Sequence, residues 1–171
     1  DINLVTDDSR LVRPGSLFVC IRHRSFDGHT AALDVLASGA AAVVTQDRLG
    51  LENELRVADS RSAYARLCAA LCNHPERKLR LIGVTGTNGK TTVTTLVRNI
   101  LSDSGTKTLL TGTVCNRLGD ENLPSGLTTP KPPELYSLLS RAVSQRCKAC
   151  VMEASSQALA QGRLEGIDFD A

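Results

Sequence analysis

Aromatic residues are scarce in this sequence of 171 residues, which has three Phe, two Tyr and no Trp, or 3% in all. Proteins that bind single-stranded nucleic acid stack bases on aromatic side chains, and those that bind duplexes present a basic stripe. The net charge is only +2, and residues of both signs are interspersed along the chain. The composition therefore argues against a nucleic-acid partner.

Long apolar runs are also absent. No stretch approaches the roughly 18 apolar residues of a transmembrane helix, and the first ten residues, DINLVTDDSR, lack the basic-then-apolar layout of a signal peptide. We therefore expect no membrane partner. Hydrophobic residues nevertheless make up 42% of the chain, which is enough to build folded cores.

Cysteine and histidine give little support to redox or metal chemistry. Cys68 and Cys72 fall on an apolar stripe with helical spacing, as buried free thiols do. A redox CxxC pair should open a helix, where the dipole lowers the thiol pKa. The CKAC pair instead joins the end of a helical pattern to an apolar run, so a redox or zinc role is the less favoured reading. The other cysteines are Cys20, Cys115, Cys147 and Cys150. The three histidines, His23, His29 and His74, lack the spacing of metal ligands.

Short apolar strands alternate with helical patterns through both halves of the chain, which predicts an α/β fold with mostly parallel sheets. The polar stretch NHPERK, residues 73–78, interrupts the alternation. We therefore place a boundary there, between an α/β domain over residues 1–77 and a second over 78–171. The predicted strands cover residues 16–21, 40–45, 55–59, 79–85, 106–111 and 149–154. The predicted helices cover 30–39 with Thr30 as N-cap, about 60–73, a segment from Lys90 onward, and 133–146, and a long loop covers 118–133.

The helix that begins at Lys90 shows a clear apolar stripe. Its members recur at the spacing i, i+3, i+4, i+7 and i+8, which predicts a helix with one face packed on the sheet. The stripe consists of Val93, Leu96, Val97, Ile100 and Leu101.

The stretch TGTNGKTT lies between a buried strand and this helix, which is the setting of a phosphate-binding loop. Glycines allow close approach to an anion, and the N–H groups of the helix N-terminus point at it. Lys90 would reach the β and γ phosphates, and the Thr91 hydroxyl would bind Mg²⁺. The strict pattern requires Gly where Val84 stands, so the loop is a variant; an ordinary glycine turn is the weaker alternative. The expected loop residues are Gly86, Thr87, Asn88, Gly89, Lys90, Thr91 and Thr92.

Two later segments follow strands of the same half, and loops at the carboxyl ends of parallel strands converge on the ligand. Glu153 ends an apolar strand, where an acid can hold Mg²⁺ beside a phosphate loop. The alternative is a helix N-terminal acid favoured by the helix dipole; the loop makes the metal role the preferred one. The residues expected to face the phosphates are Thr128, Thr129, Glu153, Ser155, Ser156, Gln161 and Arg163.

Taken together, these motifs resemble those of the Mur ligase family. GTNGKTT (residues 86–92), TTP (128–130) and MEASSQAL (152–159) resemble its central-domain motifs, in the family's order. The stretch from DSRLVRPGSLFV to GAAAVV resembles the uridine-nucleotide domain of the MurE type. The resemblance covers almost the whole chain. It implies a small N-terminal UDP-MurNAc-binding domain, followed by an incomplete ATP-binding domain with a P-loop-type parallel sheet.

The resemblance also implies roles for single residues. Lys90 and Glu153 would be catalytic, with Thr91 and Glu153 as magnesium ligands. The implied substrate contacts are Asp8 and Ser9 at the uridine end, Arg24, Ser25 and Phe26 in a loop closing over it, Thr128 and Thr129 at the muramoyl-peptide, and Ser155, Gln161 and Arg163. The chain departs from the family pattern at Gln157, where many relatives have His, and at Leu127, where some have Asn.

The implied reaction is ATP-dependent amide formation in peptidoglycan synthesis. ATP would phosphorylate the free D-Glu carboxylate of UDP-MurNAc-L-Ala-D-Glu. The amine of meso-diaminopimelate or L-lysine would then attack the acyl phosphate. No protein nucleophile is needed, and no GxSxG motif surrounds Ser155 and Ser156. The resemblance further implies a cytoplasmic monomer.

Three alternatives remain open. One is a MurF-type ligase that adds D-Ala-D-Ala to the tripeptide. Another is a non-catalytic nucleotide or UDP-sugar-binding module. The last, a generic phosphate-loop kinase, leaves the N-terminal domain unexplained.

The family continues past the position of Ala171 into a segment with a carbamylated Lys and an amino-acid-binding domain. We therefore expect this chain to be the N-terminal part of a longer enzyme and inactive on its own.

Overall fold

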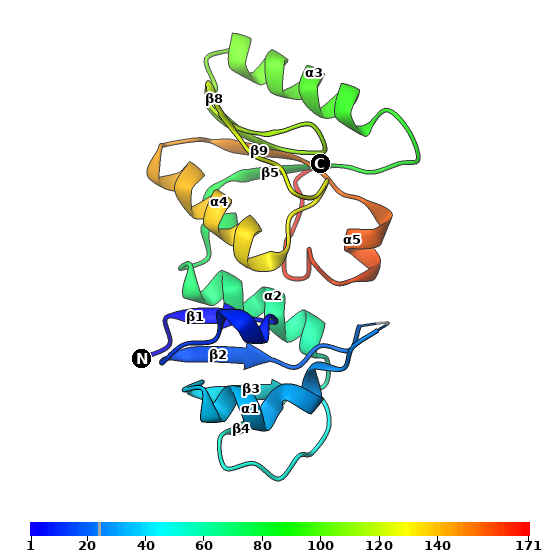
Figure 1. Ribbon diagram of the computed structural model, residues 1–171. Coiled ribbons are helices and arrows are strands. Elements are labelled where there is room, and N and C mark those ends of the chain that lie inside the picture. The colour runs from blue at the N-terminus through cyan, green and yellow to red at the C-terminus, as the bar shows by residue number, and fades with distance from the viewer. Residues whose placement is uncertain (24) are drawn as a thin grey trace. The chain divides into compact units, whose positions relative to one another are not determined.

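The computed structural model describes residues 1–23 and 25–171, and the chain divides into two compact units, Asp1–Leu71 and Cys72–Ala171. Each unit is built on its own sheet (Figure 1). This confirms the predicted α/β class with mostly parallel strands. The division falls just before the polar stretch 73–78 at which the sequence places its boundary.

The first unit contains a fully parallel sheet in the order β1-β2-β3-β4, formed by Leu4–Thr6, Ser16–Val19, Ala42–Thr45 and Glu54–Arg56. Strand β2 is buried along its whole length, which is why it reads as a continuous apolar run. The 3₁₀ turn η2 (Gly28–Ala31) and helix α1 (Ala32–Ala37) connect β2 to β3. Helix α2 (Ser60–Leu71) packs on β1. A second 3₁₀ turn, η1 (Ser9–Leu11), follows β1.

The second unit has five strands in the order β5-β9-β6-β7-β8. Three are parallel: β5 (Arg80–Val84), β9 (Ala149–Glu153) and β6 (Thr108–Thr111). The crossovers β5-α3-β6 and β6-α4-β9 run in opposite directions across the sheet. Right-handed connections therefore place α3 (Lys90–Asp103) on one face and α4 (Pro132–Ser144) on the other, as Figure 1 shows. The remaining helical pieces are η3 (Pro75–Lys78) and α5 (Ser156–Ala160).

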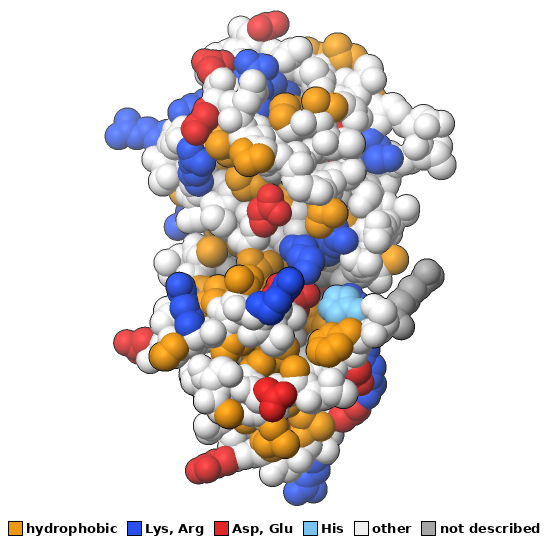
Figure 2. Space-filling view, viewed as in Figure 1, with side chains coloured by type: hydrophobic (Ala, Val, Ile, Leu, Met, Phe, Trp, Pro, Cys, Tyr) orange, Lys and Arg blue, Asp and Glu red, His pale blue; other side chains and the backbone are white. Residues whose placement is uncertain are grey.

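Charged side chains of both signs are interspersed on the molecular face drawn in Figure 2, as the composition predicts. Within the described residues, no helix combines the length and the apolar character needed to cross a membrane.

The predicted long loop over residues 118–133 is wrong at its start. Strands β7 (Asn116–Leu118) and β8 (Glu121–Leu123) form an antiparallel hairpin at the sheet edge. Its two-residue turn has Gly119 in the left-handed region at φ 58°. Strands of three residues are too short to give a recognisable alternation, and the same brevity hid β1.

The predicted packing of α3 is correct only in part: the helix packs on β6 and β9, and Val97 and Leu101 of its apolar stripe are half-buried, but the rest of the stripe is not covered. Thr94 and Arg98 are its buried residues, whereas the side chains of Val93, Leu96 and Ile100 are 44%, 56% and 67% exposed. Helical periodicity identifies an apolar face but not the element that covers it.

The N-cap of the helical segment after β2 is Asp27 and not Thr30. Asp27 Oδ1 accepts a hydrogen bond from the His29 N–H at 3.0 Å, which starts the turn at Gly28. The Thr30 hydroxyl instead donates to the Asp27 carbonyl at 2.8 Å. The strand predicted at 55–59 ends at Arg56 because Asp59 already accepts a hydrogen bond from the Arg61 N–H in the first turn of α2.

All six cysteines, which lie in the described part of the chain, are free thiols, as expected. Burial raises the pKa of both Cys147 and Cys150. Raised thiol pKa values disfavour the thiolate that redox chemistry needs, so the CKAC pair is part of the packed interior.

Candidate functional site

The loop between β5 and α3 is exposed and shaped by two glycines. Gly86 has φ 144° and Gly89 has φ 80°, values that residues with a side chain rarely adopt. Gly89 is the N-cap of α3 and offers no side chain to the first-turn N–H groups. The positive end of a 14-residue helix is therefore left open for an anion.

Lys90 lies over this loop. Its Nζ donates a hydrogen bond of 2.7 Å to the Gly86 carbonyl, which places the ammonium beside the backbone that would surround the phosphates. The lysine is the first residue of α3, so its charge adds to that of the helix N-terminus. The loop thus combines backbone donors with a cation, as phosphate sites do.

Glu153 lies behind the loop, at the carboxyl end of β9, and is 1% exposed. Its Oε1 accepts hydrogen bonds from the Thr91 hydroxyl at 2.9 Å and from the Thr113 N–H at 3.0 Å. Its Oε2 accepts from the Thr113 hydroxyl at 3.0 Å. A carboxylate this buried needs such donors. The structure thus brings together Thr91 and Glu153, the two expected metal ligands.

Two residues of this site, Gly112 and Thr113, were missed by the sequence analysis. A Cβ on Gly112 would overlap Glu153 Oε1 and come within 3.1 Å of its Cδ, so only glycine leaves room for the carboxylate. Both residues follow β6, at the same sheet edge as Glu153. The carboxyl-end rule that selected Glu153 could have selected them too.

The donor set fits a magnesium ion bound with a nucleotide. Mg²⁺ prefers oxygen ligands and takes one or two from the protein, the rest coming from water and phosphates. Thr91 and Glu153 would supply two oxygens beside the loop expected to bind phosphate. Among the described residues, no group of three or more His, Cys, Asp or Glu side chains could hold a metal ion.

Among the remaining predicted residues of this unit, hydrogen bonds join Thr129, Gln161 and Arg163 near the end of β9. Thr129, fully buried, donates to the Glu153 carbonyl at 2.7 Å and accepts from the Ser155 N–H at 3.0 Å. Arg163 donates to the Thr129 carbonyl at 2.8 Å and to Gln161 Oε1 at 2.7 Å. The Thr129 hydroxyl is therefore turned toward the protein, and its contact with substrate stays a prediction.

Ser155 and the neighbouring positions complete this region. The Ser155 hydroxyl accepts a hydrogen bond from the Ala158 N–H at 3.2 Å and caps α5. Ser156 follows it at an exposed position. The two departures from the family pattern, Gln157 and Leu127, are exposed as well.

The described residues among those predicted in the first unit lie at one sheet edge. Asp8 and Ser9 follow β1, and Ser25 and Phe26 follow the adjacent parallel strand β2. Ser9, Ser25 and Phe26 are exposed, whereas Asp8 caps η1 and pairs with Arg10 at 2.6 Å. Arg24 lies outside the described residues.

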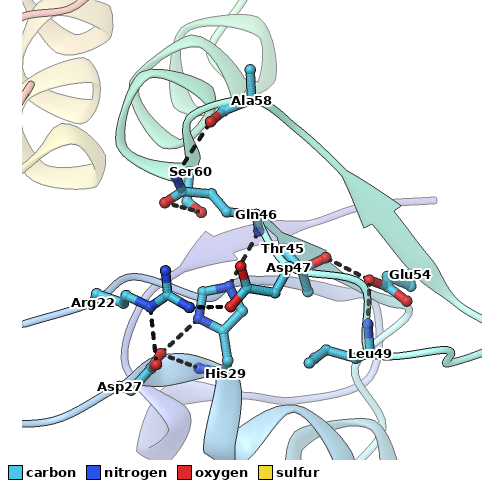
Figure 3. A network of polar contacts seen from close by, with 10 residues as sticks. All are labelled: Arg22, Asp27, His29, Thr45, Gln46, Asp47, Leu49, Glu54, Ala58 and Ser60. Atoms are coloured by element: carbon cyan, nitrogen blue, oxygen red, sulfur yellow. Dashed lines mark hydrogen bonds and ion pairs between the residues drawn. The ribbon is translucent and has the colours of Figure 1, made fainter.

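A polar network supports the base of the loop that carries Ser25 and Phe26 (Figure 3). Arg22 pairs with Asp27 at 3.1 Å and also with Asp47. The buried His29 ring lies between two partners: Nδ1 donates to Asp27 Oδ1 at 2.6 Å, and Nε2 accepts from the Gln46 N–H at 3.2 Å. The hydrogen bond from the His29 N–H is the main reason that the pKa of Asp27 falls to about 2.

Each of the two units matches a family of known proteins. Residues 1–74 match the model of the Mur ligase family, catalytic domain, and residues 84–171 match the Mur ligase middle domain. A UDP-N-acetylmuramoyl-L-alanyl-D-glutamate–2,6-diaminopimelate ligase of Geobacillus kaustophilus is 43% identical over 99% of this chain and 35% of its own length.

Solved structures show the same likeness. A structure of a UDP-N-acetylmuramoyl-L-alanyl-D-glutamate–2,6-diaminopimelate ligase matches 98% of this chain with a TM-score of 0.82 and 31% identity. MurF from Acinetobacter baumannii matches 91% with a TM-score of 0.59 at 24% identity, a likeness of fold alone. The chain spans about a third, 35%, of the length of the first two of these proteins. Because the middle-domain model alone covers more than half of the sequence, the chain belongs to the Mur ligase family.

Proposed function

We propose that this chain forms the ATP- and UDP-MurNAc-dipeptide-binding part of a MurE-type ligase, which adds the third amino acid of the peptidoglycan stem. The observation that carries this proposal is the site at the phosphate loop. A buried carboxylate, Glu153, lies 2.9 Å from the hydroxyl that follows the loop lysine. The relatives named above, which match both units, are the reason for choosing this reaction.

The chain's own groups fit the first half of such a reaction. Lys90 and the first-turn N–H groups of α3 bind the β and γ phosphates of ATP and stabilise charge on the transferring phosphoryl group. Thr91 and Glu153 would hold Mg²⁺, which would neutralise phosphate charge. The phosphoryl group passes to the free D-Glu carboxylate of the substrate, and ADP leaves.

The second half needs an amine and no protein nucleophile. The amine of the incoming amino acid attacks the acyl phosphate, an amide bond forms and phosphate leaves. The Ser155 hydroxyl is engaged as the cap of α5 and so is poorly placed to act as a nucleophile. The relatives' names favour diaminopimelate over lysine as the incoming amino acid.

The first unit binds the uridine end of the substrate in this proposal. Ser9, Ser25 and Phe26 present exposed side chains at the edge where β1 and β2 end. The ion pairs of Arg22 with Asp27 and Asp47 stabilise the base of the loop that carries Ser25 and Phe26. A protein with this role works in the cytoplasm, where ATP and the nucleotide-linked precursor are present; we propose that it acts as a monomer.

A MurF-type reaction has weaker support. The MurF likeness is one of fold, with a TM-score of 0.59 against 0.82 for the diaminopimelate ligase. Both reactions use the same phosphate loop, so the substrate distinguishes them.

A chimeric enzyme tests the reaction. This chain replaces the matching segment of the Geobacillus kaustophilus ligase, and ADP release is measured with each pair of substrates. We expect release that requires UDP-MurNAc-L-Ala-D-Glu with meso-diaminopimelate and that is lost in the Lys90→Ala chimera. Release that requires the tripeptide with D-Ala-D-Ala would show a MurF-type enzyme. A folded chimera that releases no ADP with either pair would contradict the proposal.

A further inference from the structure

The hydroxyl of Thr113 lies between two functional segments of the second unit. It is 3.0 Å from Glu153 Oε2 and 3.0 Å from the Thr128 hydroxyl. Thr128 belongs to the TTP loop, whereas Glu153 ends β9. Thr113, just after β6, therefore connects the segment expected to meet the muramoyl-peptide with the carboxylate expected to hold the metal.

The chemistry of the groups fixes the direction of these hydrogen bonds. A hydroxyl has one hydrogen to donate, and an ionised carboxylate can only accept. Thr113 therefore donates to Glu153, and Thr128 donates to Thr113. The backbone N–H of Thr113 donates to the other carboxylate oxygen at 3.0 Å. One residue thus holds both oxygens of Glu153.

Neighbouring groups leave the carboxylate little freedom. Gly112 provides the space that Oε1 occupies, and Thr129 holds the Glu153 carbonyl at 2.7 Å. Hydrogen bonds to charged groups are the stronger ones, and site geometry must hold to about 0.5 Å for ligands to bind productively. The orientation of Glu153 therefore depends on the Thr113 hydroxyl.

We propose that Thr113 is a positioning residue that orients Glu153 for the metal and links it to Thr128 through one chain of hydrogen bonds. The inference rests on the proposed function, in which Glu153 is a metal ligand. Two consequences follow. Removing the Thr113 hydroxyl weakens metal binding, although Thr113 is not itself a ligand. Removing the Thr128 hydroxyl weakens it only while Thr113 is intact.

The test measures Mn²⁺ affinity in the presence of ADP, from the electron paramagnetic resonance signal of free Mn²⁺. Thr113→Val keeps the branched shape and the backbone N–H but loses the hydroxyl. We expect about tenfold weaker Mn²⁺ binding, the usual effect of one hydrogen bond to a charged group. Thr113→Ser, which keeps the hydroxyl, should lie within about twofold of the wild type. Thr113→Ala repeats the loss with a smaller side chain.

Two further variants distinguish a failure of the positioning role from a failure of the proposed function. Thr95→Val, an exposed threonine on α3, serves as the matched control and should bind Mn²⁺ as the wild type does. Glu153→Gln should lose binding. Equal binding by Glu153→Gln and the wild type, or a wild type that takes up no Mn²⁺ with ADP, would overturn the proposed function and this inference with it.

A double-mutant cycle tests the link. Thr128→Val should weaken Mn²⁺ binding about two- to threefold in the wild type and cause no further loss in Thr113→Val, because residues in one hydrogen-bond network are not additive. Wild-type affinity in Thr113→Val, alongside loss in Glu153→Gln, would overturn the positioning role alone. Additive effects of the two valines would overturn the link.

Discussion

The Thr91 hydroxyl donates a hydrogen bond of 2.9 Å to Oε1 of Glu153, and this contact joins the first turn of α3 to the end of β9. The two residues are 62 positions apart in the sequence. The parallel pairing of β5 with β9 brings their carboxyl ends to one edge, so that the acid lies directly behind the proposed phosphate loop. The site thus follows from strand order.

Lys90→Ala should reduce the affinity for Mg²⁺-ATP on the order of 100-fold, because it removes a charged donor from the phosphates. The fold should persist, since the Lys90 side chain reaches only the Gly86 carbonyl of its own loop among the contacts seen. Calorimetric titration measures the affinity. Lys148→Ala, an exposed lysine before β9, is the matched control and should bind as the wild type does. Unchanged affinity for Mg²⁺-ATP in Lys90→Ala would contradict the assignment of this loop as a phosphate-binding loop.

Gly112→Ala should destabilise the second unit by about 1–3 kcal/mol, the range for overpacking a filled site. The cause is steric, because the new Cβ would lie within 3.1 Å of Glu153 Cδ. Urea unfolding measures the free energy. Gly126→Ala is the control, because a Cβ there meets no atom within 4 Å. Equal stability of the two variants would show that Glu153 does not need the space.

Protonation of Asp27 should make the protein less stable in acid. Its folded-state pKa is about 2, below the ordinary value, chiefly because of the hydrogen bond from the His29 N–H. A lowered folded-state pKa contributes stability above about pH 4, and that contribution is lost as the pH falls toward 2.

Solvent screens this half-exposed carboxylate, so its contribution is about 1 kcal/mol. Asp27→Asn should therefore unfold with a shallower dependence on pH between about 4 and 2. Chemical unfolding measured across that window checks the slope. Asp34→Asn, which removes another exposed carboxylate of the first unit, is the control and should keep the wild-type slope. Identical slopes for Asp27→Asn and the wild type would contradict the stabilising role of Asp27.

The parts of the proposed site that the sequence predicts share one property: their chemistry is visible in consecutive residues. The proposed phosphate loop is recognisable because glycines, lysine and threonine lie between a buried strand and an amphipathic helix. Gly112 and Thr113 belong to no such motif, and only their position after a predicted strand points to them. Their importance comes from the pairing of β6 with β9, which only the folded chain creates.

The same distinction explains the errors in the fold. The α3 periodicity correctly predicts a helix, but it does not say which neighbour covers Val93, Leu96 and Ile100, and these side chains are exposed in the described residues. The hairpin of β7 and β8 depends on pairing with β6 more than on any pattern of its own. Asp27 replaces Thr30 as a cap because the turn starts earlier than the apolar pattern does.

The proposed function requires that this chain bind the muramoyl-dipeptide precursor for a MurE-type reaction. The most direct test is calorimetric titration of the chain with UDP-MurNAc-L-Ala-D-Glu, with UDP-MurNAc-L-Ala and the tripeptide form as comparisons. We expect the dipeptide form to bind most tightly, and Ser9→Ala to weaken its binding. Tightest binding of the tripeptide form, or equal binding of all three, would contradict a MurE-type substrate site.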